Sequence, residues 1–128
     1  MKRATGIGGI FFRAKDPKAL GAWYKKHLGI DVQPWGGAAF EWKSADNPEG
    51  NGTTAWTLFP ASSKKFDPSP APFMINYRVA DLHGLLAALR SEGVQVEEKV
   101  DESEYGKFGW AMDPEGNKIE LWQPPEGG

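Results

Sequence analysis

The second half of this 128-residue chain repeats the first half in order and in spacing. Residues 12–16 (FRAKD) return as residues 77–81 (YRVAD), at an offset of 65. Residues 29–32 (GIDV) return as 93–96 (GVQV) at an offset of 64, and residues 47–51 (NPEGN) return as 113–117 (DPEGN) at an offset of 66. An internal repeat constrains the fold more than any local pattern. We therefore expect two copies of a small sheet-and-helix unit around a shared cleft.

The hydrophobic pattern gives both halves the element order βαβββ. In the first half, residues 6–14 predict a strand, Asp16 and Pro17 begin a helix that ends at Gly29, and strands follow near 30–33, 38–43 and 53–59. In the second half, the strand is expected at 73–79, the helix at 81–92, and further strands near 94–100, 107–112 and 118–122. The expected fold class is α+β, in one domain spanning 1–128. Module 1 covers about 5–60, a Ser-, Pro- and Lys-rich linker about 61–72, and module 2 about 73–124.

Composition excludes several classes of function. The chain has no cysteine, which rules out disulfides and thiolate sites. Its net charge of −2, without a basic stripe, gives no case for a nucleic-acid partner. No apolar run approaches the length of a membrane span, and the first residues lead into no apolar signal segment, so we expect a cytoplasmic protein without a membrane partner. Six Trp and seven Phe exceed what a core of this size requires.

The paired βαβββ pattern, together with residues 113–122 (DPEGNKIELW), resembles the vicinal oxygen chelate superfamily. That superfamily includes glyoxalase I, bleomycin-resistance proteins and extradiol dioxygenases, and the resemblance covers essentially the whole chain. It implies a curved mixed sheet around a cleft, with metal ligands, usually His, Gln or Glu, on the first and last strand of each unit. Carried onto this sequence, those positions are Gly9, Trp56, Met74 and Glu120. Gly9 should then overlay Met74, and Trp56 should overlay Glu120.

Three of these four positions have lost a usable metal ligand. Gly9 has no side chain, Trp56 offers only an N–H donor, and Met74 is a weak thioether acceptor. One carboxylate and one thioether cannot select the metals that this family uses. His27 and His83 lie in helical turns and are expected at the surface. We therefore predict no cofactor, and a divalent metal only if these positions are misplaced.

Strand alternation predicts which side chains line the cleft, because residues two apart share a face of a sheet. Glu120 is the candidate catalytic residue, as a general base. Aromatic walls with a few polar groups are typical of a small-molecule pocket. The candidate ligand-binding residues are Phe11, Arg13, Trp56, Met74, Asn76, Arg78, Trp110 and Trp122.

Several alternatives stay open at the level of sequence. Trp56 and Met74 either contact a ligand or fill the space of an absent metal. Arg13 and Arg78 either face the ligand or bridge to acidic neighbours, and Glu120 is either a base with a raised pKa or a family relic paired with one of those arginines.

Three functions compete. We favour metal-free binding of an apolar or aromatic small molecule. The second is an enzyme of lyase, isomerase or dioxygenase type that uses Glu120 as a base or metal ligand, and the third is a protein-interaction module. Because open sheet edges need cover and family members usually pair, we also expect a homodimer.

Overall fold

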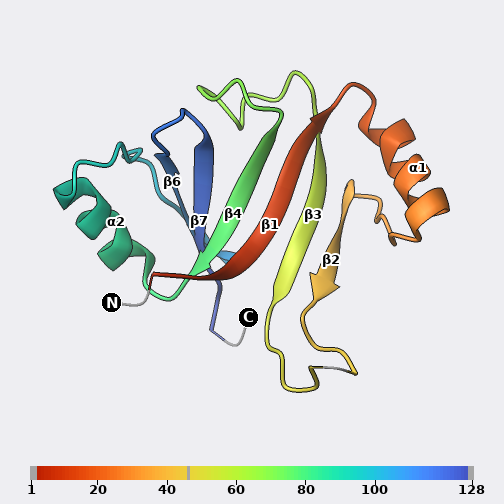
Figure 1. Ribbon diagram of the computed structural model, residues 1–128, viewed down its shortest axis with the longest axis horizontal. Helices are drawn as coiled ribbons and strands as arrows, with labels where there is room; N and C mark the ends of the chain where they lie inside the picture. Colours follow the sequence, from red (N-terminus) through yellow and green to blue (C-terminus); the bar gives the residue numbers. More distant parts are fainter. Residues whose placement is uncertain (1–2, 46, 127–128) are drawn as a thin grey trace.

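The computed structural model describes residues 3–45 and 47–126, and it contains a single curved sheet (Figure 1). The strand order is β2-β3-β1-β4-β7-β6-β5. The strands are β1 (Ala4–Ala14), β2 (Gly37–Glu41), β3 (Thr53–Pro60), β4 (Phe73–Val79), β5 (Asp101–Ser103), β6 (Gly106–Met112) and β7 (Lys118–Gln123), and the helices are α1 (Pro17–Leu28) and α2 (Leu82–Ser91).

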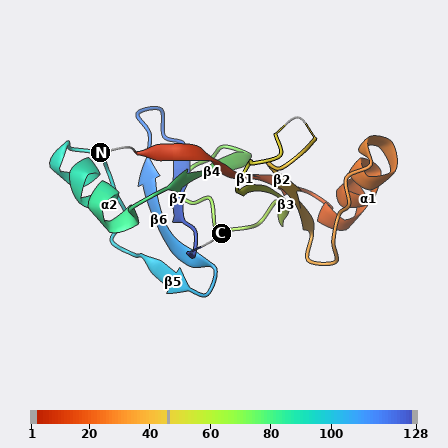
Figure 2. The same ribbon diagram turned by 90° about the horizontal axis from the view of Figure 1, so that it is seen from below.

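The two halves of the chain meet at the centre of the sheet. There β1 and β4 pair antiparallel, and each has a parallel neighbour from its own half, β3 beside β1 and β7 beside β4. Figure 2 shows the sheet from below, curled between α1 at one end and α2 at the other. The predicted α+β fold of two βαβββ-like modules in a curled mixed sheet is therefore confirmed.

Local sequence signals set the helix boundaries. The Asp16 carboxylate accepts a hydrogen bond from the Ala19 N–H, and Pro17 occupies the first turn, where a missing N–H costs nothing. Helix α1 ends where Gly29 adopts a left-handed φ of 68°, which a residue without a Cβ reaches freely. Asp81 caps α2 in the same way, through the Gly84 N–H.

Two of the predicted strands do not form in the structure. Residues 30–33 form no strand, and residues 94–100 contribute only an isolated bridge between Val96 and Ala111. The alternating apolar pattern of the second segment reflects packing, since Val96 and Val100 lie against the core beneath α2. The edge strand β5 begins immediately after this segment, at Asp101.

The core lies mainly in module 2. Helix α2 buries Leu82, Leu85 and Leu86 against Val79 and Leu121. Within the described chain, α1 buries only Gly21. Helix α2 therefore contributes three buried leucines to the core, whereas α1 contributes no buried large side chain among its described residues. None of the helices described in the structure is both long and apolar enough to cross a membrane.

Candidate functional site

One face of the sheet, the inner face, lies opposite the helices and carries most of the predicted site. Residues paired across neighbouring strands share a face. Phe11 is paired with Met74, Asn76 is paired with Glu120, and Glu120 is also paired with Trp110. All five of these side chains therefore point to the inner face, as predicted.

The prediction that Trp56 lines the cleft is wrong. Trp56 is paired with Ile10 and lies on the helix side of the sheet, with its ring centroid 5.0 Å from that of Tyr24 in α1. The inner-face residues of β3 beside Gly9 and Phe11 are Ala55 and Thr57.

A change of register explains the error. Parallel partners are 46 residues apart in module 1 (Gly9 and Ala55, 55 − 9) and 44 apart in module 2 (Asn76 and Glu120, 120 − 76). Residues of β1 correspond to residues of β4 at an offset of 65. Because the spacing is two residues shorter in module 2, residues of β3 correspond to residues of β7 at an offset of 63. The prediction that Trp56 overlays Glu120 used an offset of 64. A slip of one residue turns a side chain to the opposite face. Trp56 therefore does not overlay Glu120.

The carboxyl group of Glu120 is buried and held by two N–H donors. Asn76 Nδ2 donates to Oε1 at 2.6 Å, and Trp110 Nε1 donates to Oε2 at 2.9 Å. Glu120 is 9% exposed, and burial raises its pKa above the ordinary value. The two donors and the positive charges of Lys65 and Lys118 oppose this rise without cancelling it.

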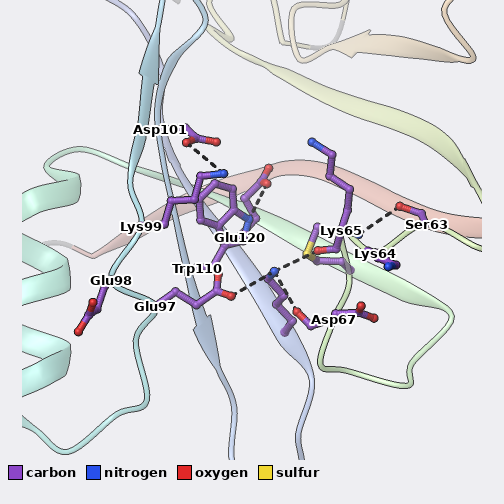
Figure 3. Close-up of a pocket in the computed structure, with 12 residues that line it drawn as sticks. Ser63, Lys64, Lys65, Asp67, Glu97, Glu98, Lys99, Asp101, Trp110 and Glu120 are labelled. Atoms are coloured by element: carbon purple, nitrogen blue, oxygen red, sulfur yellow. Dashed lines mark hydrogen bonds and ion pairs between the residues drawn. The ribbon is translucent and has the colours of Figure 1, made fainter.

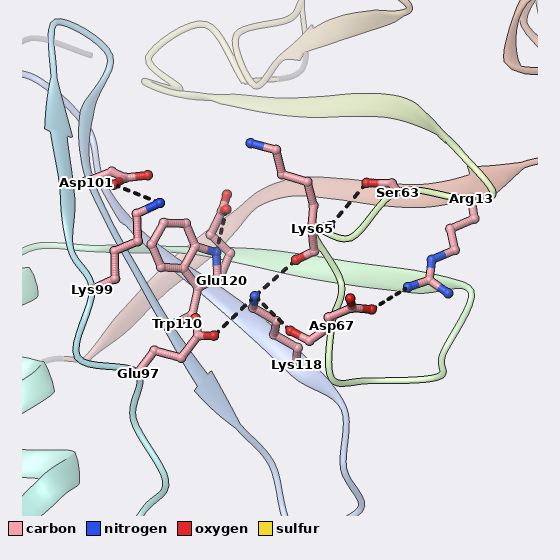
Figure 4. Close-up of polar contacts among 10 residues, drawn as sticks. All are labelled: Arg13, Ser63, Lys65, Asp67, Glu97, Lys99, Asp101, Trp110, Lys118 and Glu120. Carbon is pink, nitrogen blue, oxygen red and sulfur yellow. Dashed lines mark hydrogen bonds and ion pairs between the residues drawn. The ribbon is translucent and has the colours of Figure 1, made fainter.

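Lys118 fastens the linker to the inner face. Its buried ammonium group donates to the backbone carbonyl oxygens of Lys65 and Asp67, both at 3.1 Å, and lies 3.4 Å from a carboxylate oxygen of Glu97 (Figure 4). It also stands 5.6 Å from the centre of a Trp110 ring. One cation therefore joins β7, the linker and the segment before β5.

These contacts enclose an open pocket of about 920 Å³ beside Glu120 (Figure 3). Its size lies in the range of small-molecule sites. Met74 and Trp110 supply apolar surface, whereas the linker and the segment before β5 supply charged side chains such as Lys65 and Glu97. Trp110 is the single aromatic side chain among the described residues that line this pocket. The predicted aromatic walls are therefore replaced by a mixed, largely charged lining.

Arg78 and Trp122 lie on the inner face in a separate cluster. The Arg78 guanidinium sits between the rings of Trp42 and Trp122, at 4.9 and 5.1 Å from their centres. Burial lowers the pKa of Arg78 from its ordinary value. Trp122 also donates its indole N–H to the Tyr105 carbonyl oxygen. These side chains fill space between the two modules.

Phe11 and Arg13 belong to a third cluster, on the side of module 1. Phe11 packs against Phe59, and the Arg13 guanidinium lies 4.8 Å from the centre of the Phe66 ring and 3.9 Å from Asp67. The structure thus unites Met74, Asn76, Trp110 and Glu120, and it places the other predicted residues elsewhere.

The predicted site residues do not include the two lysines of the site. Strand alternation does place Lys118 on the face of Glu120, since it precedes Glu120 by two residues on the same strand, but it was not proposed as a site residue. Lys65 lies in the linker, and no pattern in the sequence indicates that the linker folds over the inner face.

The family profile of the glyoxalase-like domain matches residues 9–122. The chain belongs to the glyoxalase-like domain family. The resemblance to the vicinal oxygen chelate superfamily is therefore confirmed.

Solved structures share the fold of this glyoxalase-like domain. Methylmalonyl-CoA epimerase from Mycobacterium tuberculosis is 20% identical, with a TM-score of 0.61 over 95% of this chain and 89% of that chain. Streptomyces coelicolor methylmalonyl-CoA epimerase in complex with 2-nitronate-propionyl-CoA is 18% identical, with a TM-score of 0.67 over 94% and 98%. A glyoxalase/bleomycin resistance protein/dioxygenase superfamily member from Vibrio splendidus 12B01 is 11% identical, with a TM-score of 0.58 over 91% and 97%. No protein of curated function matches the chain significantly.

The donor set of this glyoxalase-like domain does not fit the metal that its superfamily commonly binds. The described residues contain no group of three or more His, Cys, Asp or Glu side chains that could hold an ion. Beside the single carboxyl of Glu120 the pocket offers only the weak thioether of Met74 at the predicted ligand positions, and the neighbouring cations Lys65 and Lys118 disfavour a further positive charge.

The protonation of Glu120 predicts a pH-dependent stability difference for Glu120→Gln. Because the folded pKa of Glu120 is raised, the folded state binds more protons than the unfolded state above the ordinary pKa of 4.5. The contribution of Glu120 to the stability of the natural chain therefore falls as the pH rises from about 4.5 to the folded pKa, with a slope of at most about 1.4 kcal/mol per pH unit. Glutamine does not titrate, and the buried Asn76 Oδ1, which has no hydrogen-bond partner among the described residues, can accept from the new amide if the Asn76 amide turns.

Urea unfolding of both proteins at several pH values between 4 and 8 measures this difference. The variant should gain stability relative to the natural chain as the pH rises, and then level off. A difference that stays constant across the range would show that Glu120 titrates alike in the folded and unfolded states.

Proposed function

We propose that this glyoxalase-like domain binds a small molecule, without a metal, in the pocket between Trp110 and the linker. The observation that carries the proposal is the buried Glu120 carboxyl, which lines this pocket and is oriented by Asn76 and Trp110. A few fixed polar groups beside apolar surface are what orients a ligand in most small-molecule sites.

The chemistry of the lining favours a ligand with both a planar apolar part and a polar group. Met74 and Trp110 offer apolar contact, and an indole face is suited to stacking. Each carboxyl oxygen of Glu120 has a second lone pair beyond the one used by its N–H donor, and the protonated form can also donate. Glu120 is thus able to exchange hydrogen bonds with a ligand while keeping both of its protein contacts.

Truncating Trp110 to alanine should weaken ligand binding. With naphthalene-2-acetamide as a planar neutral probe, the loss expected for a buried aromatic contact is about 1–3 kcal/mol. In the natural protein labelled with ¹⁵N, the Trp110 indole N–H resonance should shift on titration, because that N–H bonds directly to Glu120.

Trp56→Phe is the matched control for this experiment. It also changes an indole, but Trp56 packs on the helix side against Tyr24, so the affinity for the probe should stay unchanged. An equal loss of affinity in both variants would place the ligand elsewhere.

A second candidate function is proton transfer at carbon by Glu120. The observation that favours it is that Glu120, on the wall of the pocket, has a raised pKa. Many enzymes raise the pKa of a catalytic carboxyl group by burial so that it can act as a general base. Solvent deuterium appearing in a 2-substituted acyl thioester, and its loss in Glu120→Gln, would support catalysis. Binding without exchange would leave the simple binding function.

The homodimer remains a prediction. The sheet ends at β2 on one side and at β5 on the other, and unpaired edges of this kind are usually covered. Sedimentation equilibrium at micromolar concentration should give twice the chain mass, and a monomer would contradict the prediction.

A further inference from the structure

We propose that the ligand of this pocket carries one anionic group, such as a carboxylate, which lies between the Lys65 ammonium group and the Glu120 carboxyl. The inference rests on the proposed binding function and names the chemical class of its ligand.

Most of the charges around the pocket are already paired. The Lys118 ammonium lies 3.4 Å from Glu97, the Lys99 ammonium lies 3.7 Å from Asp101, and the Asp67 carboxylate lies 3.9 Å from Arg13. Lys65 differs from these groups, as do Lys64 and Glu98 on the same wall, but of these three only Lys65 acts on the Glu120 carboxyl. Within the described parts of the chain, its ammonium has neither an ion-pair nor a hydrogen-bond partner, and its backbone alone is engaged, with Ser63 and Lys118.

The side chains of Lys65 and Glu120 line the same part of the pocket. The Lys65 charge is one of the two lysine charges that act on the Glu120 carboxyl. The main pocket and a neighbouring hollow of about 630 Å³ share four lining residues, Lys65, Asp101, Trp110 and Glu120, which therefore stand at the junction of the two. In Figure 4 the Lys65 side chain extends on the Glu120 side of the linker, away from the Lys118 ammonium.

The charges at this junction select an anion over a cation. A cationic ligand would require ionised Glu120, which burial disfavours, and it would face the Lys65 ammonium. An anion instead pairs with Lys65 and accepts a hydrogen bond from the neutral Glu120 carboxyl. The other charged groups that the described structure places beside Glu120 are Lys118 of β7 and the carboxylates of Asp101 and Glu102 in β5. Each is already paired, Lys118 with Glu97, Asp101 with Lys99 and Glu102 with Lys107. The apolar remainder of the ligand then lies against Trp110.

Three probes with the same naphthalene ring and an anionic, a neutral or a cationic side group test the proposal by calorimetry. At a pH between the ordinary carboxyl pKa and the raised pKa of Glu120, naphthalene-2-acetate should bind about tenfold more tightly than naphthalene-2-acetamide, because a charge-assisted contact replaces a neutral one. The 2-(2-naphthyl)ethylammonium ion should bind most weakly. The affinity for the acetate should fall as the pH rises through the raised pKa of Glu120, since its ionised form repels the anion.

Variants of Lys65 test whether its charge causes the preference for acetate over acetamide. Lys65→Met should reduce the preference for acetate over acetamide to about twofold, and Lys65→Arg should retain it. Lys26→Met removes the same charge from an exposed position in α1 and should leave the preference unchanged. Glu120→Gln should bind the acetate with an affinity independent of pH.

The outcomes separate the two proposals. If acetate and acetamide bind equally, or if the cation binds best, the anionic class is overturned while the binding function stands. If none of the probes binds, the proposed function fails and this inference fails with it.

Discussion

Replacing Leu86 with alanine should lower the free energy of unfolding by about 2–5 kcal/mol, the range for a large side chain removed from a packed core. Leu86 is 1% exposed and packs within the cluster formed by Val79, Leu82 and Leu121. Strand β6 lies very close to the Leu86 side chain at Gly109, because a Cβ added at Gly109 would lie 3.0 Å from Leu86 Cδ1. The surrounding backbone therefore has little room to collapse into the cavity.

Leu28→Ala is the matched control, since it removes the same atoms from a helical leucine that is 64% exposed. We expect a change within about 0.5 kcal/mol, as for most surface substitutions. Urea unfolding followed by Trp fluorescence measures both. Similar losses in the two variants would contradict the conclusion that α2, rather than α1, is packed into the core.

Replacing Lys118 with methionine should cost about 3 kcal/mol of stability and should loosen the linker. The change keeps most of the side-chain volume, but it removes the donor to two backbone carbonyls and leaves the Glu97 carboxylate without its cation. Removing one member of a buried charged contact usually costs about 3–5 kcal/mol, and we take the lower end because Glu97 is partly exposed. The linker backbone at Lys65 and Asp67 would then lose its attachment to β7.

Two measurements distinguish this local effect from general destabilisation. Trypsin should cleave the variant after Lys64 and Lys65 faster than it cleaves the natural chain, under conditions where both remain folded. Lys107→Met is the control, because Lys107 pairs with Glu102 at an exposed site. If cleavage is equally slow in all three proteins, the linker is held by contacts other than those of Lys118.

The sequence alone determined the features that depend on local chemistry. The internal repeat, with its NPEGN and DPEGN segments, predicted two similar modules, and the caps at Asp16 and Gly29 marked the first helix correctly. The strand at 73–79 was also predicted with the observed bounds. These signals are readable because a cap, a turn or an alternating strand depends on residues only a few positions apart.

The candidate site depended partly on the sequence and partly on the tertiary structure. Alternation correctly placed Met74, Asn76 and Glu120 on one face, since Met74 is paired regularly with Phe11 of β1 and Asn76 is paired with Glu120 of β7. It failed for Trp56, whose face depends on how β3 aligns with β1. Register between strands is set by the length of the chain that connects them and by packing, and the repeat offset varied by enough to reverse the face.

Only the tertiary structure showed where the pocket lies and what charge it carries. The sequence predicted a shared cleft with aromatic walls, whereas Arg78 and two indoles fill the space between the modules. The pocket lies instead where Lys118 draws the linker over β7, which brings Lys65 beside Glu120. The contacts of Lys118 with Lys65 and Asp67 join residues 53 and 51 positions apart, and such contacts leave no periodic signal in a sequence. They form only after the sheet has folded and curved, because the curved sheet brings the buried Lys118 ammonium next to the linker.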